Sequence, residues 1–257
     1  MRFCKVNEID SAQKESEIII FGKQTCLFVL ENHSDLITEI YLGKEIDKKL
    51  FSKFARLQKP IIRLDGKKMQ ALARGGNHQN FILKVKPKQA SINIKEMRRI
   101  VILVGVSDVG NIGSIVRTCL AFGVDLLVST NEINASGVAR SSSGAFFGMP
   151  CVVCKDYLSL VNELKMAGFR LFGSDINGIN IDSLKGRISQ SGEDLSGESE
   201  SSSLGKWALF LGSEGEGLTK RVLNKMDLTL GIKISNFDSL NVGVAAGILV
   251  YELSKLK

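Results

Sequence analysis

The stretch Asn111-Ile-Gly-Ser-Ile-Val-Arg-Thr-Cys-Leu-Ala-Phe-Gly123 decides how this sequence is interpreted. It follows an apolar run, and its own apolar residues recur at helical spacing, so it predicts an amphipathic helix after a buried strand. The helix carries an amide at its start, Asn111, and a cation, Arg117. Each has an ordinary explanation when taken alone, because asparagine often caps helices and arginine often lies on exposed helix faces.

Two later blocks combine polar groups with small residues in a similar way. Leu211-Gly-Ser-Glu-Gly-Glu-Gly-Leu218 predicts a glycine-rich turn between a strand and a helix, with Glu214 inside it. Ser239-Leu-Asn-Val-Gly-Val-Ala-Ala-Gly247 places a hydroxyl and an amide, Ser239 and Asn241, at the head of a helix of small residues. Three such blocks in this order are difficult to obtain by chance, so we expect them to form one site.

The part of the chain from residue 99 onward predicts an α/β fold with a parallel sheet. Its expected strands are almost continuously apolar and alternate with helices, which is typical of a sheet covered on both faces. Ligands of such sheets bind in the loops beyond the carboxyl ends of the strands, where all three blocks fall. The expected strands are 100–106, 126–129, 151–153, 169–173, 208–211 and 228–232, and the expected helices are 112–122, 158–167, 218–225 and 240–256.

Residues 1–88 predict a separate small α/β domain, joined by a linker over residues 89–98 to a second domain over residues 99–257. Residues 1–98 hold nineteen Lys and Arg against eleven Asp and Glu, whereas residues 99–257 hold fifteen against sixteen. A basic module beside a neutral one is typical of a polyanion-binding attachment. Lysines that only solubilise helix faces would explain the charge equally well. The expected strands are 18–21, 37–42, 61–64 and 81–85, and the expected helices are 24–31, 48–57 and 67–73.

Composition excludes several classes of protein. The 257 residues are 44% hydrophobic and 24% charged, which is ordinary for a soluble globular chain, and no apolar run is long enough to span a membrane. The first residues have no apolar signal core, and five cysteines are an odd number, so we expect a cytoplasmic protein without disulfides. Cys151-Val-Val-Cys154 lacks a second pair at metal-ligand spacing, so we expect no metal.

Two common nucleotide-binding motifs are also excluded. The turn Gly212-Ser-Glu-Gly-Glu-Gly217 has the glycines of a phosphate-binding loop, but Leu218 stands where that loop needs lysine. The glycines at 105, 110 and 113 do not have the spacing of a dinucleotide-binding fingerprint. An acidic glycine turn suits a cationic ligand better than a phosphate.

Taken together, the three blocks resemble the motifs of the TrmH/SpoU family of RNA ribose 2′-O-methyltransferases, within the SPOUT class. The resemblance implies a C-terminal trefoil knot that forms the pocket for S-adenosylmethionine, which carries a sulfonium and an ammonium. It also implies a homodimer, and RNA as the partner of the basic domain, which resembles a domain related to some ribosomal proteins. A ribosomal RNA guanosine is the expected target. A transfer RNA ribose, base methylation, or a non-catalytic RNA-binding or ribosome-assembly role on the same scaffold are the alternatives.

The resemblance also implies roles for individual residues. Arg117 would stabilise the developing alkoxide or hold the adjacent phosphate, since an arginine with a pKa above about 12 is a poor base. Asn111 would orient Arg117 or the ribose, and Glu214 would hold either Arg117 or the ammonium of the cofactor. Ser239 and Asn241 would complete the polar wall.

Further residues are implied around the cofactor and the RNA. Lys233 stands where the family usually has proline, so the backbone beside Ile232 is less rigid than in the family. Arg140-Ser-Ser-Ser-Gly-Ala145 resembles the basic and serine-containing loop that the family places near its substrate. Two explanations remain open for this segment: Arg140 and Ser141 contact a phosphate of the RNA, or the segment simply starts a helix. Residues 189–206, rich in Ser, Gly and Glu, are expected to be a surface insertion. The expected cofactor contacts are Leu211, Gly212, Glu214, Gly217, Ile232, Leu240 and Asn241.

Overall fold

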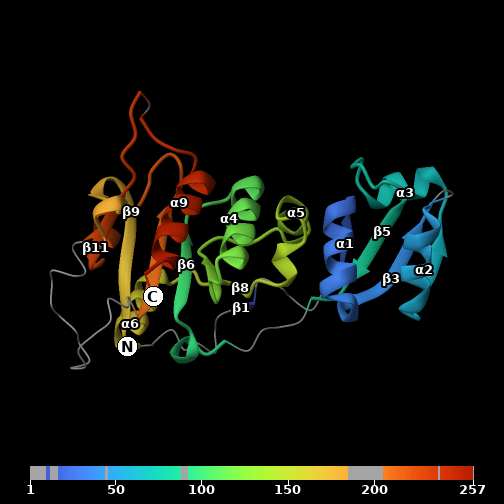
Figure 1. Cartoon of the computed structure of the whole chain (residues 1–257), viewed down its shortest axis with the longest axis horizontal. Coiled ribbons are helices and arrows are strands. Elements are labelled where there is room, and N and C mark those ends of the chain that lie inside the picture. Colours follow the sequence, from blue (N-terminus) through green and yellow to red (C-terminus); the bar gives the residue numbers. More distant parts are fainter. Residues whose placement is uncertain are drawn as a thin grey trace.

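The chain forms two sheets, each with its own helices, in the computed structural model shown in Figure 1. The structure describes residues 10–11, 17–43, 46–87, 92–184, 205–236 and 238–256. The larger sheet has the order β1-β8-β7-β6-β10-β9-β11, and the smaller sheet has the order β2-β5-β3-β4. Most of the predicted insertion over residues 189–206, and part of the predicted linker over residues 89–98, lie outside the described residues.

The larger sheet confirms the predicted parallel arrangement. Its six strands from β8 to β11 are parallel, and the short β1 (Asp10–Ser11) pairs antiparallel with β8 at one edge. Strand β9 continues beyond its predicted end at Gly173, because its second half pairs with β11 after a register shift. In chain order the strands are β6 (Arg99–Val104), β7 (Leu126–Ser129), β8 (Cys151–Val153), β9 (Phe169–Asn180), β10 (Lys206–Gly212) and β11 (Leu228–Gly231).

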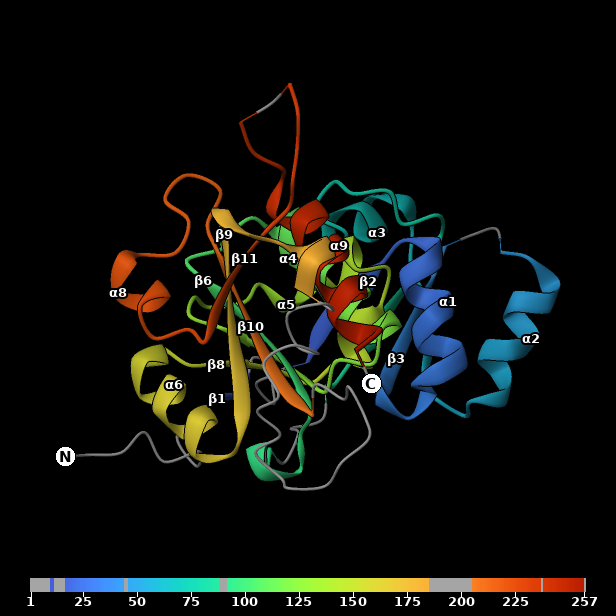
Figure 2. The ribbon, with the colours of Figure 1, turned by 60° about the vertical axis from the view of Figure 1, so that its left-hand side comes forward.

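Helices cover both faces of this sheet, as Figure 2 shows. Alternate residues of β6 face opposite ways: Val101 packs with α4 and α9, whereas Ile102 packs with α6 and α8. Helix α9 returns from the edge strand β11 to pack against α4 and β10, a path that fits the expected knot. The helices are α4 (Val109–Ala121), α5 (Ala135–Ser141), α6 (Tyr157–Met166), α8 (Lys220–Leu223) and α9 (Val242–Ser254), of which α5 was not predicted.

The smaller sheet and the helices packed on it include every strand and helix predicted for the first part of the chain. Their ends differ from the predicted ends by one residue at most. Helices α1 and α2 pack on one face through Val29 and Phe54, and α3 packs on the other through Met69. The strands are β2 (Ile18–Phe21), β3 (Ile37–Leu42), β4 (Ile61–Arg63) and β5 (Phe81–Val85). The helices are α1 (Lys23–Asn32), α2 (Lys48–Arg56) and α3 (Gly66–Leu72).

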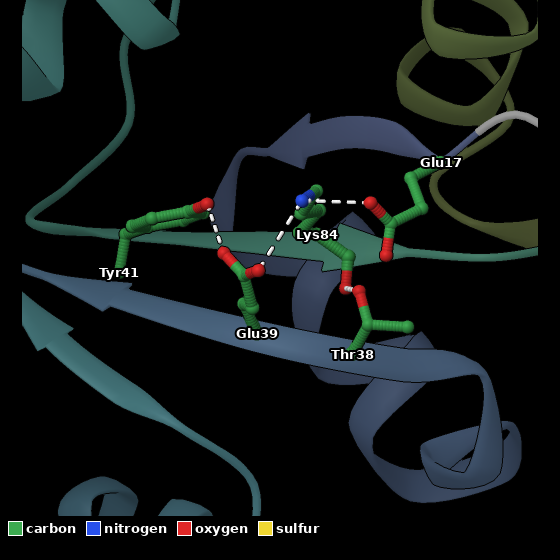
Figure 3. A network of polar contacts seen from close by, with 5 residues as sticks. All are labelled: Glu17, Thr38, Glu39, Tyr41 and Lys84. Carbon is green, nitrogen blue, oxygen red and sulfur yellow. Dashed lines mark hydrogen bonds and ion pairs between the residues drawn. The ribbon is translucent and has the colours of Figure 1, made fainter.

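A network of polar side chains ties three segments of the smaller sheet together (Figure 3). The ammonium of Lys84 on β5 lies 2.7 Å from the carboxylate of Glu17 and 3.2 Å from that of Glu39 on β3. The hydroxyl of Tyr41 also donates to Glu39. These hydrogen bonds lower the pKa of both carboxyls and raise the pKa of Lys84. The cross-strand contacts therefore stabilise the charged forms of all three groups.

We call the smaller sheet with α1, α2 and α3 the first module, and the larger sheet with its helices the second module. The two modules share one apolar core. In Figure 1, α5 lies between α4 and α1, and residues of α1 and β2 belong to the same buried cluster as residues of α5. A Cβ added at Gly144 would lie 2.9 Å from the Phe28 ring of α1, so glycine permits this close approach. The Ser136 hydroxyl of α5 donates to the carbonyl of Ile19 on β2 at 2.8 Å. Packing and hydrogen bonds thus fix how the modules sit together.

Three further expectations concern membranes, metals and cysteines. None of the described helices is long and apolar enough to cross a bilayer. No group of three or more potential metal ligands occurs among the described residues. Cys151 and Cys154 are both buried, and burial raises the pKa of the Cys151 thiol, so it stays protonated in the core.

Candidate active site

The three sequence blocks begin at the same edge of the larger sheet. They follow β6, β10 and β11, which are parallel strands whose carboxyl ends meet at that edge. The register pairs Val104 with Gly212, so the loop before α4 and the glycine turn after β10 start side by side. The fold therefore brings together segments that lie far apart in the sequence.

A hydrogen-bonded triad joins the three blocks. The side-chain amide of Asn111 donates to Glu214 Oε1 at 3.0 Å, and the amide of Asn241 donates to the same oxygen at 2.5 Å. Asn241 Nδ2 also lies 2.9 Å from Asn111 Oδ1. Each block supplies one member, and the carboxylate of Glu214 accepts from both asparagines. The triad is therefore the centre of the candidate site.

The two asparagines reach the triad from different helix positions. Helix α4 is capped by Asp108, whose carboxylate accepts from the Asn111 N–H at 2.7 Å, so the Asn111 side chain does not cap it. Asp108 was missed by the sequence interpretation, although an aspartate three residues before this point is a recognised N-cap signal. Asn241 caps α9 itself, because its Oδ1 accepts from the N–H groups of Gly243 and Val244.

Two glycines allow the turn after β10 to close on itself. A Cβ added at Gly212 would lie 2.1 Å from the carbonyl carbon of Gly217, a distance that only glycine avoids. Gly217 has a φ of 64° and donates its N–H to the Ser213 carbonyl at 2.9 Å. Leu211, directly before the turn, is fully buried. The turn thus holds Glu214 at a fixed place relative to the sheet.

A second close approach brings α4 and α9 together beside the triad. A Cβ added at Gly243 would lie 2.4 Å from the hydroxyl oxygen of Ser114. The Ser114 hydroxyl donates to the carbonyl of Asn111 at 2.9 Å, so its position is fixed. The helix that carries Asn111 and the helix that Asn241 caps therefore pack with little space between them.

Arg117 and Ser239 lie outside the triad. Both are exposed, and within the described residues neither side chain has a hydrogen-bond or ion-pair partner. Glu214 therefore contacts the two asparagines and not Arg117. Arg117 lies on α4, six positions beyond Asn111. Its positive charge is not compensated by any described carboxylate, which leaves the guanidinium available for an anionic ligand.

Two expected cofactor-binding residues, Ile232 and Leu240, lie on the segment between β11 and α9. Ile232 follows β11 and packs partly against the main core, and Leu240 is partly buried directly before Asn241. Lys233, which replaces the usual proline of the family, is exposed. Leu240 thus adds apolar surface directly beside Asn241, and Ile232 adds apolar surface at the end of β11.

Arg140 and Ser141 end a helix and do not start one, because α5 finishes at Ser141. The Ser141 hydroxyl donates to the carbonyl of Val109 at 2.7 Å, so it links α5 to the first turn of α4. A Cβ added at Gly113 would lie 2.0 Å from the same hydroxyl oxygen. Arg140 is exposed, with its guanidinium carbon 4.6 Å from the centre of the Phe21 ring.

Comparison with protein families finds two matches that together span most of the chain. Residues 98–251 match the SpoU rRNA methylase family. Residues 19–91 match the family described as RNA 2′-O ribose methyltransferase substrate binding. The first match covers the six parallel strands and all three site blocks, and the second covers the smaller sheet.

Several characterised and uncharacterised relatives are similar in sequence. An uncharacterized tRNA/rRNA methyltransferase of Borreliella burgdorferi is 29% identical over 236 residues, covering 84% of this chain and 96% of the relative. A putative TrmH family tRNA/rRNA methyltransferase of Staphylococcus epidermidis is 27% identical over 255 residues, covering 92% of this chain and 95% of the relative. The 23S rRNA (guanosine(2553)-2′-O)-methyltransferase RlmP of Bacillus subtilis is 34% identical over 161 residues, which are 61% of this chain and 58% of the relative.

Solved structures show the same fold over nearly the whole chain. The SpoU methyltransferase AviRb of Streptomyces viridochromogenes, in complex with AdoMet, superposes with a TM-score of 0.70 at 19% identity, covering 93% of this chain and 90% of AviRb. An AdoMet-bound rRNA methyltransferase of Sinorhizobium meliloti has a TM-score of 0.68 at 18% identity, with coverage of 93% and 87%. The chain therefore belongs to the SpoU rRNA methylase family and is an RNA 2′-O-ribose methyltransferase with a substrate-binding N-terminal part.

Proposed function

We propose that this chain transfers a methyl group from S-adenosylmethionine to the ribose 2′-hydroxyl of a guanosine in structured ribosomal RNA. The observation that carries the proposal is the triad of Asn111, Glu214 and Asn241, which gathers all three motif blocks at one sheet edge. The similarity to the Bacillus subtilis guanosine methyltransferase supports ribosomal RNA as the substrate.

The residues at this edge fit S-adenosylmethionine. Glu214 is a carboxylate held by two amides, and it suits the positive charge that the ammonium and sulfonium of the cofactor carry. Gly212 lets the turn close tightly, and Gly217 allows its positive φ, so the turn can present Glu214 to a cofactor. The apolar side chains of Leu211, Ile232 and Leu240 suit the adenine. When bound, the cofactor supplies an electrophilic methyl group.

Arg117 is proposed to act on the RNA side of the site. The 2′-hydroxyl would pass its proton to water as its oxygen takes the methyl group and the carbon–sulfur bond breaks to release S-adenosylhomocysteine. A guanidinium would stabilise the developing negative charge or the adjacent phosphate. Because no described carboxylate neutralises Arg117, its charge remains available for this purpose. Asn111 would orient the ribose from the same helix, and the Ser239 hydroxyl would complete the wall from the other side.

A homodimer is proposed because α9 has an uncovered apolar surface. Val244 and Tyr251 are 51% and 46% exposed, and a Cβ added at Gly247 between them would meet no described atom within 4 Å outside its own helix backbone. A second copy packed on this face would bury these side chains. Sedimentation of the purified protein tests the assembly, and a monomer that is fully active at micromolar concentration contradicts it.

We also propose a cytoplasmic location, where ribosomal RNA is processed.

Mapping of ribose methylation in total RNA, from cells with and without the gene, tests the proposed activity. A 2′-O-methyl group blocks alkaline cleavage, so the modified position appears as a gap that is lost with the gene. We expect one gap at a guanosine of ribosomal RNA. A gap in transfer RNA instead would change the substrate but not the reaction. Unchanged methylation, together with no binding of S-adenosylmethionine, would favour a non-catalytic RNA-binding protein.

A further inference from the structure

A cleft between the two modules contains no residue of the triad, although Arg140, the expected phosphate contact, lines it. It has a volume of about 510 Å³, which lies within the range of ligand-binding sites. One wall comes from the start of α1 and the loop before β5, and the other comes from the end of α5 and the residues after it. Its lining residues are Phe21, Gly22, Lys23, Gln24, Thr25, Gly76, Asn77, Gln79, Arg140 and Ser143.

The cleft has a positive charge that nothing in its walls compensates. Lys23 and Arg140 line it, and none of its lining residues is acidic. Both cations are exposed, and among the described residues neither has a carboxylate partner. The remaining polar side chains include three carboxamides, Gln24, Asn77 and Gln79, which both donate and accept hydrogen bonds. This combination suits a ligand with anionic groups and neutral hydrogen-bonding edges.

The guanidinium of Arg140 is held in position at the cleft. Its carbon lies 4.6 Å from the centre of the Phe21 ring, a cation–π contact from the second module to the first. A Cβ added at Gly76 would lie 2.3 Å from an atom of the same ring, so the absence of a side chain there makes room for Phe21. Arg140 therefore presents its charge with fewer accessible conformations than a free surface arginine.

Helix α5 connects the cleft to the candidate active site. Arg140 is followed by Ser141, whose hydroxyl binds the Val109 carbonyl in the first turn of α4, two residues before Asn111. The other side of α5 contacts β2 of the first module. A chain molecule lying in the cleft could thus continue over α5 toward the triad.

We propose that this cleft binds the backbone and a base of the substrate RNA, at a nucleotide that flanks the methylated one. Lys23 and Arg140 would neutralise successive phosphates, and Asn77 and Gln79 would contact the edge of an unpaired base. The proposal rests on the proposed RNA methylation and adds a second contact point that sets which ribose reaches Arg117.

The test compares full-length variants that lose the same charge at different places. Lys23→Gln/Arg140→Gln removes both cations of the cleft. Lys95→Gln/Arg98→Gln removes one lysine and one arginine that are also exposed but lie before β6, at the opposite edge of the larger sheet. The probe is ribosomal RNA from cells that lack the gene, and its affinity is measured over a salt series.

We expect the cleft variant to bind the RNA more weakly, with a slope of log affinity against log salt that is shallower by about 1.5, since each phosphate contact contributes roughly 0.7–0.9. The control variant should keep the wild-type slope. Asn77→Ala/Gln79→Ala should lower the affinity without changing the slope, because carboxamides carry no charge. All variants should bind S-adenosylmethionine normally, which shows that they are folded.

Equal slopes for the cleft variant and the control variant would overturn the proposal, because the cleft would then be only a gap between packed modules. Failure of the proposed function appears differently: the wild-type protein would neither bind S-adenosylmethionine nor methylate the RNA, whatever the salt dependence of the variants.

Discussion

At the scale of single residues, the site consists of a hydrogen-bonded triad and of an exposed cation that is free to contact a ligand. Asn111, Glu214 and Asn241 satisfy one another through hydrogen bonds, whereas Arg117 remains exposed on the helix that carries Asn111. A preorganised polar group and an uncompensated cation have different tasks, since the first positions ligands and the second stabilises negative charge. Substitutions at the two parts should therefore have different effects.

Arg117→Ala should abolish methyl transfer and leave the affinity for S-adenosylmethionine nearly unchanged, because Arg117 does not contact the triad. Glu214→Ala should reduce both, since it removes the acceptor shared by two asparagines. Isothermal titration with the cofactor and transfer of a labelled methyl group to RNA measure the two effects. Arg117→Lys is the matched control and should restore only part of the activity, because lysine keeps the charge but loses the planar fork. Unchanged turnover of Arg117→Ala would show that the assignment is wrong.

At the scale of elements, the strands and helices were largely predictable from the sequence, because apolar runs and helical periodicity depend on local pattern. Helix α5 was not predicted, since Ala135–Ser141 is short and rich in small and polar residues, and its helical state depends on packing against α4 and β2. The structure brings one residue of each predicted site block, Asn111, Glu214 and Asn241, into contact. The Asp108 cap of α4 is a local contact that the N-cap signal could have predicted, whereas the contacts of Glu214 with two asparagines could not be predicted, because they depend on the three-dimensional register of distant loops.

The turn after β10 should be sensitive to a single methyl group added at Gly212. In Gly212→Ala the added Cβ meets the backbone of Gly217, which cannot rotate away as a side chain can, so the turn must open. We expect loss of cofactor binding and a lower stability, by about 1–3 kcal/mol. Gly215→Ala is the control, because no described atom lies within 4 Å of its added Cβ. Cofactor titration and thermal unfolding of both variants distinguish them, and equal behaviour would contradict a closed turn.

The network around Lys84 should make the first module sensitive to acid. Hydrogen bonds from Lys84 and Thr38 hold the pKa of Glu17 below the ordinary 4.5, and hydrogen bonds from Tyr41 and Lys84 do the same for Glu39. The stabilising contribution of both carboxylates is therefore present above pH 4.5 and is lost as the pH falls through their lower folded pKa values. The raised pKa of Lys84 means that its contribution is complete below 10.5 and is lost only at higher pH.

Lys84→Met should therefore lower the resistance to denaturant at pH 7, and the difference from wild type should shrink below about pH 4.5, where the carboxylates become protonated. Urea unfolding followed by circular dichroism at pH 7 and at pH 3 measures this. Lys67→Met, which changes an exposed lysine of α3 outside the network, is the control and should behave as wild type at both pH values. A pH-independent difference for Lys84→Met would indicate that its effect comes only from altered packing.

At the scale of the whole molecule, the two modules behave as one body in their packing. The buried cluster runs from β2 and α1 through α5 to the larger sheet, and β1 pairs residues 10–11 with β8. Removing residues 1–88 would expose the apolar side chains around Phe146 and remove β1 from the edge of β8, which would keep only its pairing with β7. Charge substitution is therefore a cleaner way than truncation to test whether the basic first module binds RNA.

Reversal of three lysines, Lys48→Glu, Lys49→Glu and Lys67→Glu, should weaken RNA binding and reduce its salt dependence by up to about one unit for each phosphate that these lysines neutralise. The three positions lie in the first turns of α2 and α3, where a carboxylate is favourable, so the fold should be retained. Lys155→Glu, just beyond β8 in the larger sheet, is the control. An unchanged slope for the triple variant would leave these lysines only a solubilising role.

Asn241 connects the start of the last helix, α9, to the triad. Its oxygen holds the N–H groups of Gly243 and Val244 at the start of α9, while its nitrogen holds Glu214 and Asn111. Whatever binds Glu214 and steadies this side chain must also tighten the last helix, so ligand occupancy and helix fraying are thermodynamically linked. The amide protons of Gly243 and Val244 should then exchange with solvent more slowly when the cofactor is present. Asn241→Asp, which keeps the cap oxygen but loses the donor, would uncouple the two, and the C-terminal helix would no longer report on the site.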